Sequence, residues 1–173
     1  MQRCILALFT LAASMGVQAA SENVDINLVT SQSVGQAIGN IKISETDKGL
    51  EFTPDLKALP PGEHGFHLHA NASCQPAIKD GKAVAAGAAG GHFDPHNTGK
   101  HEGPDGAGHL GDLPFLVVNS DGKATQSVVA PRLKTLDEVK GKALMIHVGG
   151  DNMSDSPQPL GGGGERFACG VIK

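Results

Sequence analysis

The chain has 173 residues, and its 14 Lys and Arg against 18 Asp and Glu give a formal net charge of −4 at pH 7. A mildly acidic chain of this composition does not favour nucleic acid or an anionic membrane surface as a partner. It contains three Cys, eight His and six Phe, but neither Trp nor Tyr.

The first 19 residues have the pattern of a secretory signal peptide. Arg3 precedes an apolar run over residues 5–11, and the small residues Val17 and Ala19 follow it. Signal peptidase accepts such an ending, and the run is shorter than the roughly 20 residues of a membrane-spanning helix. We predict cleavage after Ala19, which leaves residues 20–173 as one domain with a net charge of −5 and no membrane anchor.

Short strands dominate the rest of the chain. Turn formers such as Pro60-Pro61-Gly62 and Asp121-Gly122 separate runs of alternating or β-branched residues. This pattern favours an all-β sandwich or a Greek-key barrel. The predicted strands cover residues 24–30, 37–44, 50–53, 65–70, 116–119, 126–130, 144–148 and 167–172.

Two long segments interrupt the strand pattern. Residues 71–114 are glycine-rich, and residues 149–164 end in four consecutive glycines. A compact domain seldom contains such long irregular loops unless they carry function. We expect a bound metal or a disulfide to order them.

The cysteines divide between the signal peptide and the domain. Cys4 precedes the apolar run, so it leaves with the signal peptide and cannot be a lipidated cysteine after that run. Cys74 and Cys169 remain, and an even pair in an exported chain favours a disulfide over two free thiols. Such a bridge closes a loop of nearly the whole domain, which the chain-entropy model values at about 4 to 5 kcal/mol.

Three histidines lie in predicted strands. His67 and His69 are two residues apart, so both side chains project from the same face of a strand and can bind one ion. His147 follows the apolar residues of another strand, where an unpaired imidazole would be costly. These positions predict a metal site carried by strands.

The first long loop supplies a second set of donors, at spacings of nine, eight and three residues. Three imidazoles and one carboxylate make a closed tetrahedral zinc site, whereas four nitrogen ligands suit copper(II). His92 is needed in both sets, which requires a bridging imidazolate with one nitrogen on each metal. The zinc set is His92, His101, His109 and Asp112, and the copper set is His67, His69, His92 and His147.

These residues carry a resemblance to a known family. Gly-Phe-His-Leu-His at 65–69 and Gly-Gly-Gly-Gly-Glu-Arg-Phe-Ala-Cys-Gly-Val-Ile at 161–172 resemble the two signatures of the copper,zinc superoxide dismutases. Residues 91–95 and 109–112 resemble the zinc-loop ligands of that family, and the arrangement is most like its enterobacterial periplasmic branch. One departure is Ala72, where the first signature usually has glycine or proline.

The resemblance implies the fold and the reaction. It implies a Greek-key, eight-stranded β-barrel or sandwich with two long functional loops, formed by residues 20–173. It also implies dismutation of superoxide to oxygen and hydrogen peroxide, with one copper and one zinc ion per chain, as antioxidant defence in the periplasm. Copper cycles between Cu(II) and Cu(I), whereas the role of zinc is structural and electrostatic.

The resemblance implies roles for three further features. Asp151 matches the carboxylate that links a copper histidine to a zinc histidine and orients both rings. Arg166 matches the arginine whose positive charge draws superoxide to the copper. His92 matches the bridging histidine that leaves copper on reduction and supplies a proton.

Two further predictions concern the attraction of the substrate and the oligomeric state. Lys79 and Lys82 are candidates for the local positive charge that an acidic protein needs in order to steer an anion, a behaviour known for superoxide dismutases. The low aromatic content favours a monomer over a homodimer, because stable interfaces prefer aromatic anchors.

Two other functions are weighed against the enzyme. A periplasmic copper or zinc carrier would keep the barrel but lack a ligand or Arg166, and both ligand sets and Arg166 are present. A disulfide-linked adhesion sandwich without metal would have scattered histidines. The paired strand histidines and the loop quartet argue against it.

Overall fold

A computed structural model of the chain describes residues 20–173, so the predicted signal peptide over residues 1–19 lies outside the described residues. One curled antiparallel sheet contains seven strands in the order β5-β10-β11-β1-β2-β3-β9. Their bounds are β1 Ser21–Val29, β2 Val34–Thr46, β3 Gly49–Leu56, β5 Phe66–His69, β9 Val128–Ala130, β10 Ala143–His147 and β11 Arg166–Val171.

Two strand pairs and three short 3-10 turns complete the described part of the chain. The pairs are β4 Gly62–His64 with β8 Leu116–Val118, and β6 Ala77–Lys79 with β7 Lys82–Val84. The 3-10 turns are η1 Gly87–Ala89, η2 Leu136–Glu138 and η3 Pro159–Gly162. Across residues 20–173 no helix is long and apolar enough to cross a membrane.

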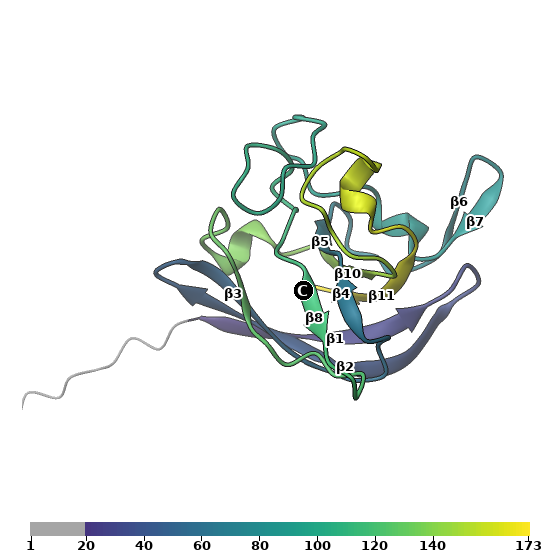
Figure 1. Ribbon diagram of the computed structural model, residues 1–173, viewed down its shortest axis with the longest axis horizontal. Coiled ribbons are helices and arrows are strands. Elements are labelled where there is room, and N and C mark those ends of the chain that lie inside the picture. Colours follow the sequence, from purple (N-terminus) through teal and green to yellow (C-terminus); the bar gives the residue numbers. More distant parts are fainter. Residues whose placement is uncertain (1–19) are drawn as a thin grey trace, which may run out of the picture.

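The curvature of the sheet encloses the core. Strands β1, β2 and β3 form the lower part of Figure 1, and the loops after β7 and β10 rise above the strands. Ile26 of β1, Ile41 of β2 and Leu116 of β8 belong to one buried cluster, so the β4–β8 pair packs across the inside of the sheet. The fold belongs to the predicted Greek-key barrel class. The curled seven-stranded sheet forms a half-barrel.

A β-bulge in β2 explains an irregular hydrophobic spacing. Ile38 and Ile41 are both buried although they are three positions apart, which breaks the alternation of a regular strand. Ile26 pairs with Gly39 and Asn27 pairs with Ala37, so Ile38 is the extra residue. Such a bulge increases the local twist and lets the long strand bend around the core.

Every predicted strand has a counterpart, but three short strands were not predicted. Strand β4 ends at His64, just before the predicted strand over residues 65–70. Strands β6 and β7 lie within residues 71–114, the segment predicted to be irregular. Their turn contains Asp80 at φ 50° and Gly81 at φ 75°. Both residues lie in the left-handed region that a type I′ hairpin turn requires, so an Asp-Gly hairpin signal was present in the sequence.

The predicted disulfide is confirmed between Cys74 and Cys169, which are 95 residues apart. It ties the start of the first long loop to β11. Because Asn71 N donates to Ala89 O at 2.9 Å, the same loop is also closed by a backbone hydrogen bond. The segment before His92 is thereby fixed against the sheet.

Candidate metal centre

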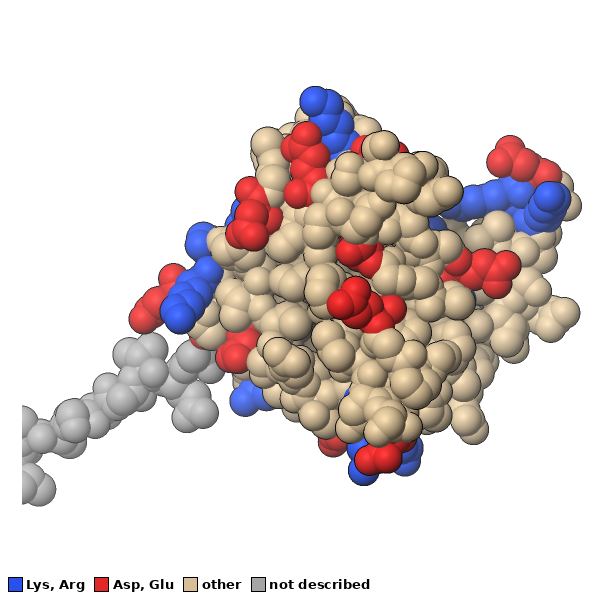
Figure 2. All heavy atoms as spheres, viewed as in Figure 1, with Lys and Arg blue, Asp and Glu red and all other residues tan. Residues whose placement is uncertain are grey.

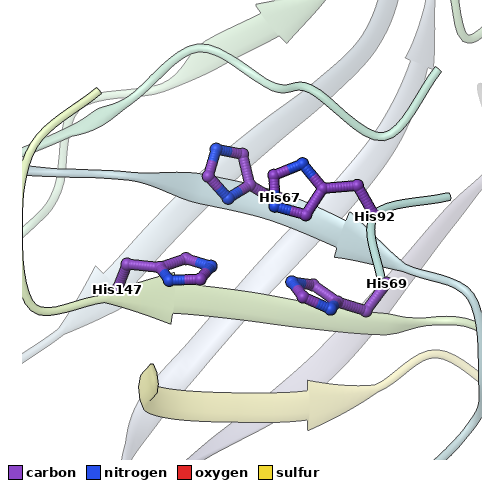
Figure 3. Close-up of side chains that lie close together, drawn as sticks. All are labelled: His67, His69, His92 and His147. Atoms are coloured by element: carbon purple, nitrogen blue, oxygen red, sulfur yellow. The ribbon is translucent and has the colours of Figure 1, made fainter. Parts of the chain in front are cut away.

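Four buried histidines from three parts of the chain form the strand group, defined as His67, His69, His92 and His147. His67 and His69 project from β5, and His147 ends the neighbouring strand β10, while the loop brings in His92. One nitrogen from each ring lies within 4.8 Å of the others. Figure 3 shows the four rings gathered around a common space.

The hydrogen bonds of these rings leave their inner nitrogens free. His67 Nδ1, His69 Nε2 and His147 Nε2 are buried and have no hydrogen-bond partner within residues 20–173. Each outer nitrogen contacts a fixed acceptor: His67 Nε2 lies 2.6 Å from Asp151 Oδ2, His69 Nδ1 lies 3.0 Å from Gly90 O, and His147 Nδ1 lies 3.1 Å from Gly164 O. When the outer nitrogen of a neutral ring carries the proton and donates it to oxygen, the inner nitrogen has a free lone pair. Three such lone pairs without a donor are costly unless a metal ion occupies the space between them, so the residues fit a nitrogen-coordinated metal.

A second buried set is the loop group, defined as His92, His101, His109 and Asp112. The Nδ1 atoms of the three histidines lie 2.9, 3.0 and 3.3 Å from the same atom, Asp112 Oδ1. A carboxylate oxygen has two lone pairs and cannot accept three strong hydrogen bonds. Zinc bonds of about 2.0 to 2.1 Å in a tetrahedron place neighbouring ligand atoms about 3.3 to 3.4 Å apart. The observed spacing is close to that value, so this set fits a small tetrahedral ion.

Asp151 connects the two groups. Its Oδ2 accepts from His67 Nε2 at 2.6 Å, and its Oδ1 contacts His101 Nε2 at 2.8 Å. Met153 N also donates to Oδ1 at 2.8 Å, which fixes the carboxylate. The family resemblance implies this linking role for Asp151, and the contacts are consistent with that role.

Burial and carboxylate contacts shift the pKa values of these rings in opposite directions. Burial lowers the pKa of His147 to about 3, and it lowers the pKa of His92 to about 4 although Asp112 opposes the shift. Burial also disfavours the charged form of His101, but contacts with Asp112 and Asp151 outweigh it and raise its pKa to about 9. Although burial favours their neutral forms, hydrogen bonds from His101 hold the pKa values of Asp112 and Asp151 well below the usual range. One imidazolium between two carboxylates therefore stands beside neutral, ligand-ready rings.

We expect the metal-free protein to lose stability as the pH falls from about 6.5 to about 4. His92 and His147 have folded pKa values of about 4 and about 3, against about 6.5 when unfolded. The unfolded state thus binds more protons in this window, so the stability conferred by the neutral rings is complete above pH 6.5 and is lost as the pH falls. Urea unfolding of metal-free protein between about pH 4.5 and 7.5 measures it. His147→Gln should flatten the dependence, and an unchanged slope in that variant would contradict the assignment.

Arg166 lies beside the strand group at the start of β11. Its guanidinium donates to Ala86 O at 2.6 Å and to Gly90 O at 2.5 Å, and Gly90 O also accepts from His69 Nδ1. Burial lowers the pKa of Arg166, but not enough to neutralise a guanidinium at ordinary pH. A fixed positive charge therefore shares a carbonyl partner with His69 of the strand group.

The two candidate steering lysines lie on the projecting β6–β7 hairpin, at the upper right of Figures 1 and 2. Lys79 and Lys82 face each other across this pair, and both are exposed. Lys82 and Arg166 line the same cleft of about 470 Å³. Lys82 and Arg166 therefore flank one cleft, whose lining also includes the acidic residue Glu165.

Two histidines lie outside both groups. His64 is buried, with Nδ1 at 2.7 Å from His147 O and Nε2 at 2.8 Å from Pro60 O. His96 is exposed in the loop. His64 therefore supports the backbone behind His147 and does not point a nitrogen into the strand group.

The glycine run at residues 161–164 lies close to both groups. A Cβ at Gly161 would lie 2.7 Å from His101 Nε2 and would overlap Asp151 Oδ1, and its φ of +72° is a left-handed conformation. A Cβ at Gly163 would lie 3.1 Å from the His147 Cβ. These glycines let the backbone approach both groups closely, which composition alone did not indicate.

Comparisons of sequence and structure show which known proteins this chain is similar to. Residues 37–172 match the family model of copper/zinc superoxide dismutase. The chain is 75% identical over 173 residues to Superoxide dismutase [Cu-Zn] of Escherichia coli strain K12, covering all of both chains. The solved Cu/Zn superoxide dismutase from Brucella abortus is 55% identical with a TM-score of 0.88, and it covers 89% of this chain and 100% of its own.

A second solved structure is described as the monomeric copper, zinc superoxide dismutase from Salmonella enterica. It is 78% identical with a TM-score of 0.81, and the match covers 89% of this chain and 100% of that one. The family model covers most of the chain, and the relatives match over nearly its whole length. This chain therefore belongs to the copper/zinc superoxide dismutase family.

Proposed function

We propose that the chain catalyses the dismutation of superoxide with a copper ion held by the strand group and a zinc ion held by the loop group. The observation that carries this proposal is the set of buried, unpartnered nitrogens on His67, His69 and His147, next to the fixed charge of Arg166. Membership of the family gives the reaction, in which two superoxide ions and two protons yield O₂ and H₂O₂. Copper, when bound, supplies the reversible one-electron chemistry that zinc lacks.

The protein residues have separate tasks in this scheme. Arg166 binds the anionic substrate, because carbonyls 86 and 90 hold two of its N–H groups while its charge remains beside the strand group. His92 Nδ1 faces Asp112, so the nitrogen that it offers to the strand group is Nε2. We assign the proton transfer to His92, as membership of the family implies, with Nε2 as the atom that would hold the proton delivered to reduced oxygen.

A direct assay tests this function. Superoxide decay followed by stopped flow should accelerate with the metal-loaded protein and yield one H₂O₂ and one O₂ per two superoxide ions. The metal-free protein is the control. A metal carrier would bind copper and zinc without accelerating the decay. That result would contradict the enzyme function and favour the carrier function.

Lys79 and Lys82 are proposed to steer the substrate toward Arg166. We expect Lys79→Glu to lower the dismutation rate about two- to threefold at low ionic strength and much less near 1 M salt, where the Debye length is about 3 Å. Lys123→Glu, in the turn after β8, makes the same charge change as a control. Equal rates for Lys79→Glu and the parent at low salt would remove Lys79 from this role.

The proposed location is the bacterial periplasm, after removal of residues 1–19. The disulfide between Cys74 and Cys169 is typical of an oxidising compartment, and the relatives named above are bacterial. We also propose that the enzyme is a monomer, which the monomeric relative from Salmonella supports. N-terminal sequencing of the exported protein and its sedimentation mass test these two points.

A further inference from the structure

Arg132 lies between β9 and η2, and its guanidinium is enclosed by the loop that carries the loop group. It is half-buried, and among residues 20–173 it has no carboxylate partner. All three of its nitrogens donate to backbone carbonyls instead: Nε to Pro104 O at 3.0 Å, Nη1 to Gly108 O at 3.1 Å, and Nη2 to Gly103 O at 3.5 Å and to His109 O.

The positive charge of Arg132 favours the convergence of these carbonyls. They come from both sides of the turn over residues 105–107, so the loop folds back around one point. The oxygen ends of peptide dipoles repel one another, and a charged donor with several N–H groups offsets this repulsion by charge-assisted hydrogen bonds. A lysine ammonium has three donors without the planar fork of arginine, so it matches this ring of acceptors less well.

The cation is anchored to the barrel through its neighbour. Leu133 is 1% exposed, and its carbonyl accepts from Leu50 N of β3 at 2.8 Å. The backbone of Arg132 therefore cannot move without disturbing the sheet. The hydrogen bonds from the guanidinium therefore hold the loop in a fixed position relative to the sheet.

The backbone segments on the two sides of the turn, residues 100–104 and 108–112, are held together around Arg132. His109 N donates to Lys100 O at 2.8 Å, and Glu102 N donates to Asp112 Oδ2 at 3.1 Å. Arg132 adds hydrogen bonds to the carbonyls of Gly108 and of His109 itself. His109 is thus restrained at its N–H, its carbonyl and its ring.

We propose that Arg132 is a positioning residue for zinc, which it serves by fixing the backbone that presents His109 and Asp112. This inference rests on the proposed assignment of the loop group to zinc. It predicts a selective effect, because His67, His69 and His147 of the strand group are held by paired strands that Arg132 does not contact. Copper binding should therefore depend much less on Arg132 than zinc binding does.

The test compares zinc and copper affinities of the mature, metal-free protein by competition with chelators. Arg132→Met removes every donor at similar length, and Arg132→Lys keeps the charge. We expect zinc affinity to fall about 10- to 100-fold in Arg132→Met and less in Arg132→Lys, with copper affinity within about twofold of the parent. Lys134→Met is the matched control, since this exposed lysine two residues away has no side-chain hydrogen bond among the described residues.

The ratio of the two affinities separates positioning from general stability. Arg132→Met with parental zinc affinity would overturn the inference, and so would an equal loss of zinc and copper affinity. A parent protein that binds copper but no zinc would instead overturn the zinc assignment, and the inference with it. If Arg132→Met does not fold, the same readings apply to Arg132→Lys.

Discussion

Replacing His147 with Gln is expected to remove copper from the protein and abolish superoxide dismutation while zinc stays bound. His147 belongs to the strand group alone, and its free Nε2 is one of three buried lone pairs that converge there. Changes to residues that merely orient a ligand weaken metal binding by about 10- to 100-fold, so loss of a ligand should lower activity by more than about 100-fold. Zinc should persist because Asp112 and the histidines of the loop group are unchanged.

The measurement is copper and zinc content of dialysed protein together with the rate of superoxide decay. His96→Gln serves as the control, because His96 is exposed and lies outside both groups. It should keep the parental metal content and rate. Full activity in His147→Gln would contradict a role for the strand group in holding copper.

Replacing Gly161 with Ala is expected to break the link between the two groups. The added methyl group would occupy space next to Asp151 Oδ1 and His101 Nε2. Asp151 would have to move, and His67 would lose its partner at the same time. We expect zinc affinity to fall about 10- to 100-fold, with a smaller loss of copper affinity.

Gly141 provides a matched control for backbone strain. It has nearly the same φ, +71° against +72°, but nothing lies within 4 Å of a Cβ at that position. Gly141→Ala should therefore lower the free energy of unfolding by about 1 to 2 kcal/mol without changing metal affinity. Equal metal affinities in the two alanine variants would show that Asp151 tolerates the methyl group.

The strands were predictable because their hydrophobic pattern follows from their burial. The alternating patterns around Leu50 and Leu116 each lie in a strand, since a two-residue period fits a half-buried sheet. Strand β10 around Leu144 is buried at every residue, so a continuous apolar run marks it instead. The hairpin over β6 and β7 was missed because each strand has three residues and Ile78 is exposed, so no hydrophobic face marks it. The Asp80-Gly81 turn was the one local signal that could have revealed it.

The residue types and spacing of the metal groups were visible in the sequence, but their supports were not. His67 and His69 required only the period of a strand, and the shared position of His92 followed from counting ligands. Arg132 acts through backbone carbonyls, which have no residue-specific pattern. Gly161 looked like any glycine in a run, because its close approach to Asp151 depends on how two distant loops fold together.

Titration of the copper-free, zinc-loaded mature protein with copper is the most direct test of the proposed function. Superoxide dismutation should rise in proportion to added copper, reach a plateau at one copper per chain, and disappear when copper is removed by a chelator. A protein that takes up one copper per chain without gaining activity would contradict the account, and so would activity that does not depend on copper.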